Sequence, residues 1–133
     1  MPDTAILKKL TPVLVVEAIE PSLAFFEKRI GFTKTVEVPH DGKIGFAILV
    51  RDGVELMLQS EASVQADMGI ASKPTLGSSA ALYVEVSDLE AIVKALEGVK
   101  LALARRKTFY GAEEVGVIEP GGHFIVFAQP VKE

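Results

Sequence analysis

The sequence predicts an α+β fold of two tandem βαβββ modules that form curved mixed sheets around a cavity, with the helices on the outside. Two observations lead to this prediction. The order strand–helix–strand–strand–strand occurs twice along the chain. The segment Val16–Glu20, before the first expected helix, is matched by Val86–Glu90 before the second. The chain of 133 residues has the length of one domain, and we expect modules over residues 8–60 and 79–131 and a linker over 61–78.

The first module follows from apolar runs and the turn residues between them. Pro12–Val16 is apolar and β-branched, which is typical of a buried strand. A helix is expected from Glu20 to Ile30, because Pro21 suits a first helical turn, apolar residues recur at helical spacing and Gly31 is a typical stop. The remaining strands are expected at Phe32–Val38, Ile44–Val50 and Val54–Gln59.

The segment Ser60–Ser79 differs from its surroundings. It holds Ser, Gly, Ala, Asp and Pro and has little periodicity. A structureless loop of this length is uncommon inside a small domain. We therefore expect either a crossover connection or a functional flap.

The second module repeats the first. Ala80–Val86 has the pattern of a strand. Ser87 and Glu90 match a capping box, which predicts that Ser87 caps a helix that ends at Gly98. The last strands are expected at Leu101–Arg105, Glu113–Ile118 and His123–Gln129.

The composition excludes several classes of protein. Cysteine is absent, which excludes disulfides, cysteine-based metal sites and a cysteine nucleophile. With 49% hydrophobic and 24% charged residues the chain is globular and not intrinsically disordered. The net charge of −4 disfavours nucleic-acid binding, which usually needs a basic face. The sequence contains no glycine-rich phosphate loop and no Gly-x-Ser-x-Gly motif.

Two observations bear on the cellular location. The first residues lack the basic start and apolar core of a signal peptide. The longest stretch without Asp, Glu, Lys or Arg, Pro120–Val131, is shorter than the roughly 20 apolar residues that a membrane-spanning helix needs. We therefore expect a cytoplasmic protein with no membrane partner.

Three motifs stand out along the chain: the Ser22-x-x-Phe25-Phe26 helix with its end Ile30-Gly31-Phe32, the helix start Val86–Leu89 and the turn Pro120–Gly122. Together they resemble the vicinal oxygen chelate superfamily, which includes glyoxalases, bleomycin resistance proteins and extradiol dioxygenases. The resemblance spans nearly the whole chain and implies a fold of paired βαβββ modules.

Enzymes of this superfamily hold a divalent metal with His and Glu side chains from four strands, and the resemblance implies where these ligands would lie. The corresponding positions here are Thr11, Glu55 or Met57, Ala81 and Val126. Only Glu55 can bind a metal, and one carboxylate does not hold a catalytic ion against water. His40 and His123 match none of these positions. We therefore expect no metal and no other cofactor.

The departure from the metal-binding pattern favours the metal-free, bleomycin-resistance-like branch. The segments Leu10–Leu14 and Phe109–Gly111 resemble members of that branch. Such proteins bind ligands in a cavity or a dimer groove, so the resemblance implies binding without metal chemistry.

Strand alternation predicts which side chains line the cavity. The side chains that alternate with helix-facing apolar residues form a mostly apolar wall with a few polar groups, as in small-molecule sites. This predicted wall consists of Thr11, Val13, Glu55, Met57, Tyr83, Phe124 and Val126. Phe109 and Tyr110 are expected to close over a ligand. The alternative is that the same side chains fill the cavity.

Each candidate also has a purely structural interpretation. Glu55 is either a buried carboxylate with a raised pKa or a solvated group at a strand edge. The Phe109–Gly111 segment is either a cover for the ligand or an anchor for its loop. For the other polar residues we favour the structural interpretation: a hydrated strand start for Glu113 and Glu114, a solvated basic run for Arg105–Lys107 and a turn residue for His123.

Together these features predict metal-independent binding of a small, partly apolar molecule in a concave pocket, and the acidic balance suits a cationic ligand. An unpaired sheet edge and the habit of the superfamily predict a homodimer. Two alternatives stay open. One is a glyoxalase- or dioxygenase-type lyase, isomerase or oxygenase, with a metal bound elsewhere or with Glu55 and Tyr110 as general acid and base. The other is a non-catalytic interaction module.

Overall fold

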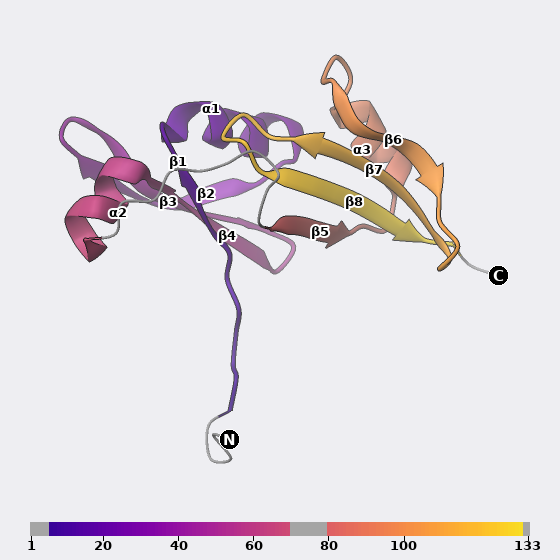
Figure 1. Cartoon of the computed structure of the whole chain (residues 1–133), viewed down its shortest axis with the longest axis horizontal. Coiled ribbons are helices and arrows are strands. Elements are labelled where there is room, and N and C mark those ends of the chain that lie inside the picture. The colour runs from indigo at the N-terminus through magenta and orange to yellow at the C-terminus, as the bar shows by residue number, and fades with distance from the viewer. Residues whose placement is uncertain (1–5, 70–79, 132–133) are drawn as a thin grey trace.

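A computed structural model describes residues 6–69 and 80–131, so residues 70–78 of the expected linker lie outside the described part (Figure 1). The elements are β1 (Val13–Val16), α1 (Ile19–Ala24), the π-helical turn η1 (Phe25–Arg29), β2 (Thr33–His40), β3 (Lys43–Arg51), β4 (Val54–Ser60), α2 (Glu61–Met68), β5 (Ala81–Glu85), α3 (Leu89–Ala95), β6 (Leu101–Lys107), β7 (Ala112–Ile118) and β8 (Phe124–Pro130).

The predicted fold is confirmed: each module contributes one open four-stranded mixed sheet, in the orders β1-β4-β3-β2 and β5-β8-β7-β6. The β1–β4 and β5–β8 pairs are parallel and the other pairs are antiparallel.

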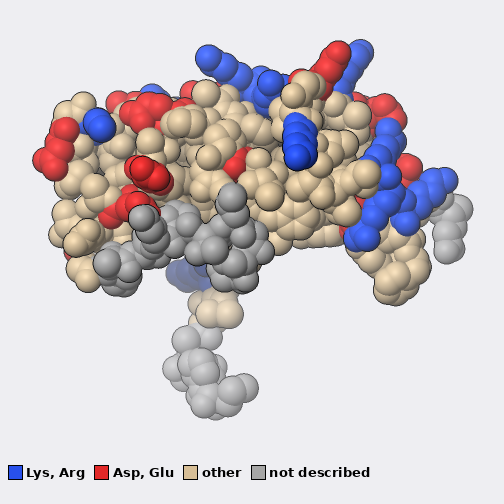
Figure 2. All heavy atoms as spheres, turned by 45° about the horizontal axis from the view of Figure 1, so that its top comes forward, with Lys and Arg blue, Asp and Glu red and all other residues tan. Residues whose placement is uncertain are grey.

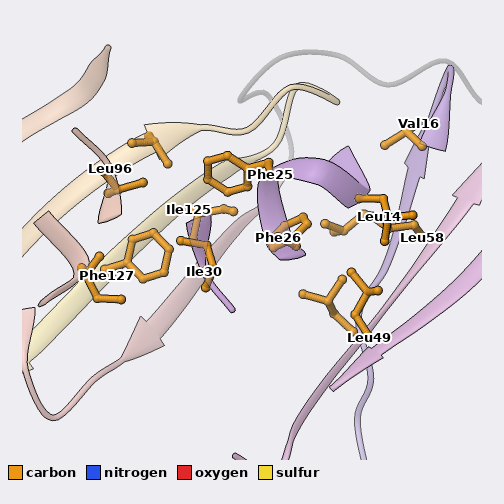
Figure 3. Packing of buried hydrophobic residues seen from close by; sticks show 14 of the residues in the cluster. Leu14, Val16, Phe25, Phe26, Ile30, Leu49, Leu58, Leu96, Ile125 and Phe127 are labelled. Carbon is orange, nitrogen blue, oxygen red and sulfur yellow. The ribbon is translucent and has the colours of Figure 1, made fainter. Parts of the chain in front are cut away.

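One hydrophobic core joins the two modules. The helix α1 packs on β3 and β4, and α3 packs on β7 and β8. Phe26 and Ile30 of the first module lie beside Ile125 and Phe127 of β8 (Figure 3). Each module therefore covers apolar side chains of the other. None of the helices in the described part is long and apolar enough to cross a membrane.

Burial alternates along β3, along the first part of β4 and along β5, and so defines two faces of each sheet. On β4, Leu56 and Leu58 are buried in the core, whereas Met57 is partly exposed on the opposite face. On β7, Val115 and Val117 are buried in the core shared with α3. We call the face opposite the core the concave face, because the sequence predicted the cavity there.

Part of the expected linker forms the helix α2. The hydroxyl of Ser60 caps this helix and accepts the backbone N–H of Ser63 at 3.1 Å. Val64 is buried, and the side-chain amide of Gln59 donates to the hydroxyl of Ser63 at 3.2 Å. Since Gln59 alternates with Leu58, α2 covers one end of the concave face of the first sheet. The helix has too few apolar residues to leave a periodic signal in the sequence.

The predicted cap of α3 is wrong by one residue. Asp88 is the N-cap in place of Ser87, and its Oδ1 accepts the backbone N–H of Ala91 at 3.3 Å. The backbone N–H of Leu89 donates instead to Oε1 of Gln129 on β8 at 2.7 Å. This tie between a helix start and a distant strand has no local sequence signature, and it shifts the start of the helix.

Candidate ligand-binding site

A cleft of about 560 Å³ opens between the modules, where the start of β4 faces β5. Core side chains, among them Phe26 and Phe127, form its apolar floor, and the extended segment before β1 forms a further wall. The side chains of the lining that carry polar or charged groups are Lys9, Glu55, Tyr83 and Glu85. The cleft is thus largely apolar with a few polar groups at its walls.

Glu55 stands on one wall of the cleft, held by the segment before β1. Its Oε1 lies 2.5 Å from Nζ of Lys9 and accepts the hydroxyl of Thr11 at 3.3 Å. The Lys9 ammonium and its hydrogen bond lower the pKa of Glu55 below the ordinary 4.5. The interpretation of Glu55 as a buried carboxylate with a raised pKa is therefore wrong, because a cation compensates its charge.

Tyr83 stands on the opposite wall and is bound to a buried carboxylate. Its hydroxyl donates to Oε2 of Glu114 at 2.6 Å. The hydroxyl of Tyr110 donates to the same oxygen. Arg106 donates to the other oxygen, Oε1, from Nε at 3.1 Å and from Nη2 at 2.9 Å. We call Tyr83, Tyr110, Arg106 and Glu114 the Glu114 cluster.

The expectation of a hydrated Glu114 is wrong, because only 1% of the residue is exposed. It alternates with the core residue Val115 and therefore lies on the concave face. Hydrogen bonds from Tyr110, Tyr83 and Arg106 hold its pKa below 4.5 despite burial. The same carboxylate raises the pKa of Tyr83 above 10, since it accepts a hydrogen bond from the protonated phenol and repels a phenolate.

The basic run Arg105–Lys107 on β6, which we expected to be solvated, is so only in part. Basic side chains gather at the end of the second module in Figure 2, over the region that β6 occupies in Figure 1. In this run Arg106 bonds the buried Glu114, and Arg105 pairs with Glu90 of α3. Both arginines therefore have defined carboxylate partners, although each stays exposed.

The remaining predicted site residues lie along the concave faces and are not part of the cleft lining. Met57 is partly exposed on β4, and Val126 is buried on β8. The ring of Phe124 closes over Gly116, where an added Cβ would come within 2.9 Å of the ring. Phe109 is fully exposed, and its ring meets that of Tyr110 edge to face at 5.1 Å. The structure thus brings Glu55 and Tyr83 together in the cleft and places Tyr110 in the Glu114 cluster.

A second buried carboxylate, which sequence reasoning did not single out, closes the turn between β7 and β8. Glu119 is 1% exposed and accepts the backbone N–H of Gly121 at 2.8 Å and that of His123 at 3.2 Å. Nδ1 of His123 lies 2.5 Å from its Oε2. A Cβ at Gly121 would lie 2.7 Å from the hydroxyl of Ser22 on α1, so the turn packs tightly against the first module. His123 is therefore a structural turn residue here.

The residues at the four positions implied for metal ligands do not fit a divalent ion. Thr11, Ala81 and Val126 supply no carboxylate or imidazole, and Glu55 is already paired with Lys9. Over residues 6–69 and 80–131, no group of three or more His, Cys, Asp or Glu side chains is placed to hold a metal. A step through a metal ion therefore has no support from the donors of this cleft.

Comparison with known proteins identifies the fold. No protein family model and no curated protein sequence matches the chain. A glyoxalase/bleomycin resistance protein/dioxygenase from Nocardioides superposes with a TM-score of 0.74 at 18% identity, covering 98% of this chain and 89% of that one. A glyoxalase-related enzyme from Fulvimarina pelagi gives 0.71 at 21% identity, covering 92% and 88%. A glyoxalase/bleomycin resistance protein/dioxygenase family enzyme from Burkholderia phytofirmans PsJN gives 0.73 at 18% identity, covering 90% and 95%.

The chain therefore has the fold of the glyoxalase/bleomycin resistance/dioxygenase proteins, the vicinal oxygen chelate fold. The resemblance seen in the sequence is confirmed at this level. At such identities the likeness extends to the fold alone, and function has to be argued from the site.

Proposed function

We propose that this protein binds a small, partly apolar molecule in the cleft between β4 and β5 without using a metal ion. The observation that supports this function is the cleft itself, whose volume of about 560 Å³ lies within the roughly 300–1,000 Å³ of small-molecule sites. Its floor offers apolar contact, and Glu55 and Tyr83 offer polar contact from opposite walls. Both polar groups are held by neighbours, so little ordering is needed when a ligand enters.

A ligand screen by thermal shift, followed by isothermal titration of the compounds that stabilise the protein, tests this proposal. Ala81 is exposed in the lining, so Ala81→Phe places a ring in the cleft without displacing core side chains. We expect this variant to lose at least tenfold in affinity for a cleft ligand. The matched control is Ala102→Phe on β6, at an exposed position outside the cleft. Equal affinity of both variants and the wild type would place the ligand elsewhere and contradict the proposal.

We also propose that two copies of the chain form a homodimer. Ile6, Leu7 and Leu10 are 82%, 96% and 90% exposed on the extended segment before β1, whose beginning reaches away from the sheets (Figure 1). Apolar side chains gathered in this way favour a partner surface, and a second copy is the partner always present. Light scattering should give twice the monomer mass of 14.3 kDa, and Leu7→Ser should weaken the dimer. A monomer at micromolar concentration would refute the dimer and leave the cleft proposal standing.

A further inference from the structure

Glu114 fixes the hydrogen-bonding character of both tyrosines on the concave face. The hydroxyls of Tyr83 and Tyr110 both donate to its Oε2. A phenol has one proton, so each oxygen that has donated it can only accept further hydrogen bonds. Tyr83 and Tyr110 are 55% and 53% exposed, so a ligand can reach their rings. Of the two tyrosines only Tyr83 is part of the cleft lining, so its phenol oxygen is the acceptor that the cluster offers to a cleft ligand.

Arg106 does not add hydrogen-bond donors to the cleft wall. It bonds Oε1, the carboxylate oxygen that the tyrosines do not use. It also lies on β6, at the opposite edge of the sheet from β5, the strand that carries Tyr83 and borders the cleft. Arg106 is not part of the cleft lining, whereas Tyr83 is, so Tyr83 is the group of the cluster that a cleft ligand meets first.

We propose that the Glu114 cluster selects ligands that carry an N–H or O–H donor beside an aromatic or apolar body, and that it disfavours ligands that offer only acceptors there. This inference rests on the proposed function and names the ligand class of the same site. The apolar body packs against the half-exposed ring of Tyr83, which lines the cleft, and the donor bonds the phenol oxygen of the same residue. An acceptor at that place would face the lone pairs of this oxygen and would lose its bond to water without a replacement.

The two tyrosines make a selective probe. The sequence has two Tyr and no Trp, and both tyrosines belong to the Glu114 cluster. In protein labelled with 3-fluorotyrosine, both fluorine resonances therefore report on this site. Titrations compare benzamide with N,N-dimethylbenzamide, and benzylammonium with benzyltrimethylammonium. Within each pair the charge and the ring are constant, and methyl groups replace the N–H donors.

We expect benzamide and benzylammonium to shift the Tyr83 resonance and to bind about five- to tenfold more tightly than their methylated partners, the equivalent of one net hydrogen bond. Equal affinities within both pairs, or tighter binding of benzoate than of benzamide, would overturn the inference while the cleft still binds a small molecule. If none of the compounds bound and the ligand screen also found nothing, the proposed function would fail together with the inference.

Variants of the adjacent residues Glu113 and Glu114 separate the effect of the Glu114 cluster on ligand preference from a general effect of charge. In Glu114→Gln the amide N–H can donate to the phenol oxygens. The phenol O–H groups are then free to donate to a ligand, so the preference for ligands with donors should disappear. Glu113→Gln removes the same charge from the other face of β7 and should keep the preference. If Glu114→Gln does not fold, Tyr83→Phe removes the acceptor and keeps the ring, with the same expected loss. A donor preference that survives Tyr83→Phe would contradict the inference.

Discussion

The hydroxyl of Tyr83 lies 2.6 Å from Oε2 of Glu114, although β8 runs between the strands that carry the two residues. The tyrosine side chain therefore crosses β8 beside Val126, its own register partner, and Ala128, the register partner of Glu114, which are 8% and 1% exposed. A buried carboxylate on β7 thus positions a side chain in the wall of the cleft. Rigid placement of this kind lowers the ordering cost of binding.

Acid should destabilise the protein partly through Glu114. Its pKa in the folded chain lies below the ordinary 4.5, so its stabilising contribution is complete above that pH and is lost as the pH falls through the folded value. Urea denaturation at a series of pH values should show the free energy of unfolding falling below about pH 4.5 in the wild type. Glu114→Gln should show a smaller fall, since its amide does not titrate, and about 1–3 kcal/mol less stability at neutral pH. Glu113→Gln should keep the wild-type slope; an unchanged slope in Glu114→Gln would contradict this prediction.

Tyr83 should ionise at a higher pH than an ordinary tyrosine. Its hydroxyl donates a hydrogen bond to Glu114, which stabilises the protonated phenol. Desolvation and the negative charge of Glu114 also disfavour the phenolate, so the pKa of Tyr83 lies above 10. In Tyr110→Phe the near-ultraviolet absorbance of phenolate reports Tyr83 alone. We expect its midpoint to stay above 10 in this variant and to move towards 10 when Glu114→Gln is added. A midpoint at 10 in Tyr110→Phe, with folding verified by circular dichroism, would show that the contact with Glu114 is absent.

Two neighbouring residues of β4 should differ in their contribution to stability. Leu58 is fully buried in the core, and Leu58→Ala should cost about 2–5 kcal/mol of unfolding free energy. Met57 is partly exposed on the concave face, and Met57→Ala should cost about 1 kcal/mol or less because little packed surface is lost. Chemical denaturation of both variants measures the difference. Similar large losses would place Met57 in the core and remove it from the concave face.

The features that were predictable from the sequence are those with local causes. The repeat of Val16–Glu20 as Val86–Glu90 fixes the order of elements, and apolar runs define most strands. Gly31 and Gly98 follow the two expected helices and have φ values of +81° and +85°, a region that glycine enters at little cost. The fold could therefore be predicted closely from periodicity and breakers.

The polar part of the site could not be predicted in the same way. Glu114 follows another glutamate and has the local pattern of a hydrated strand start. Its burial depends on Tyr83, 31 residues away in the sequence, and on the strand register that brings the two together. The helix α2 is a similar case, because its burial depends on the concave face of a sheet formed earlier in the chain. A single sequence contains no signal for such contacts.

Isothermal titration of one cleft ligand, with and without a metal chelator, tests most directly the claim that this protein binds a small molecule without a metal. The ligand is the compound that stabilises the protein most in the thermal-shift screen, and the protein is the wild type beside Ala81→Phe. We predict one affinity under both conditions for the wild type and a loss of at least tenfold for Ala81→Phe. Binding that disappears with the chelator and returns with a stoichiometric divalent ion would contradict the account.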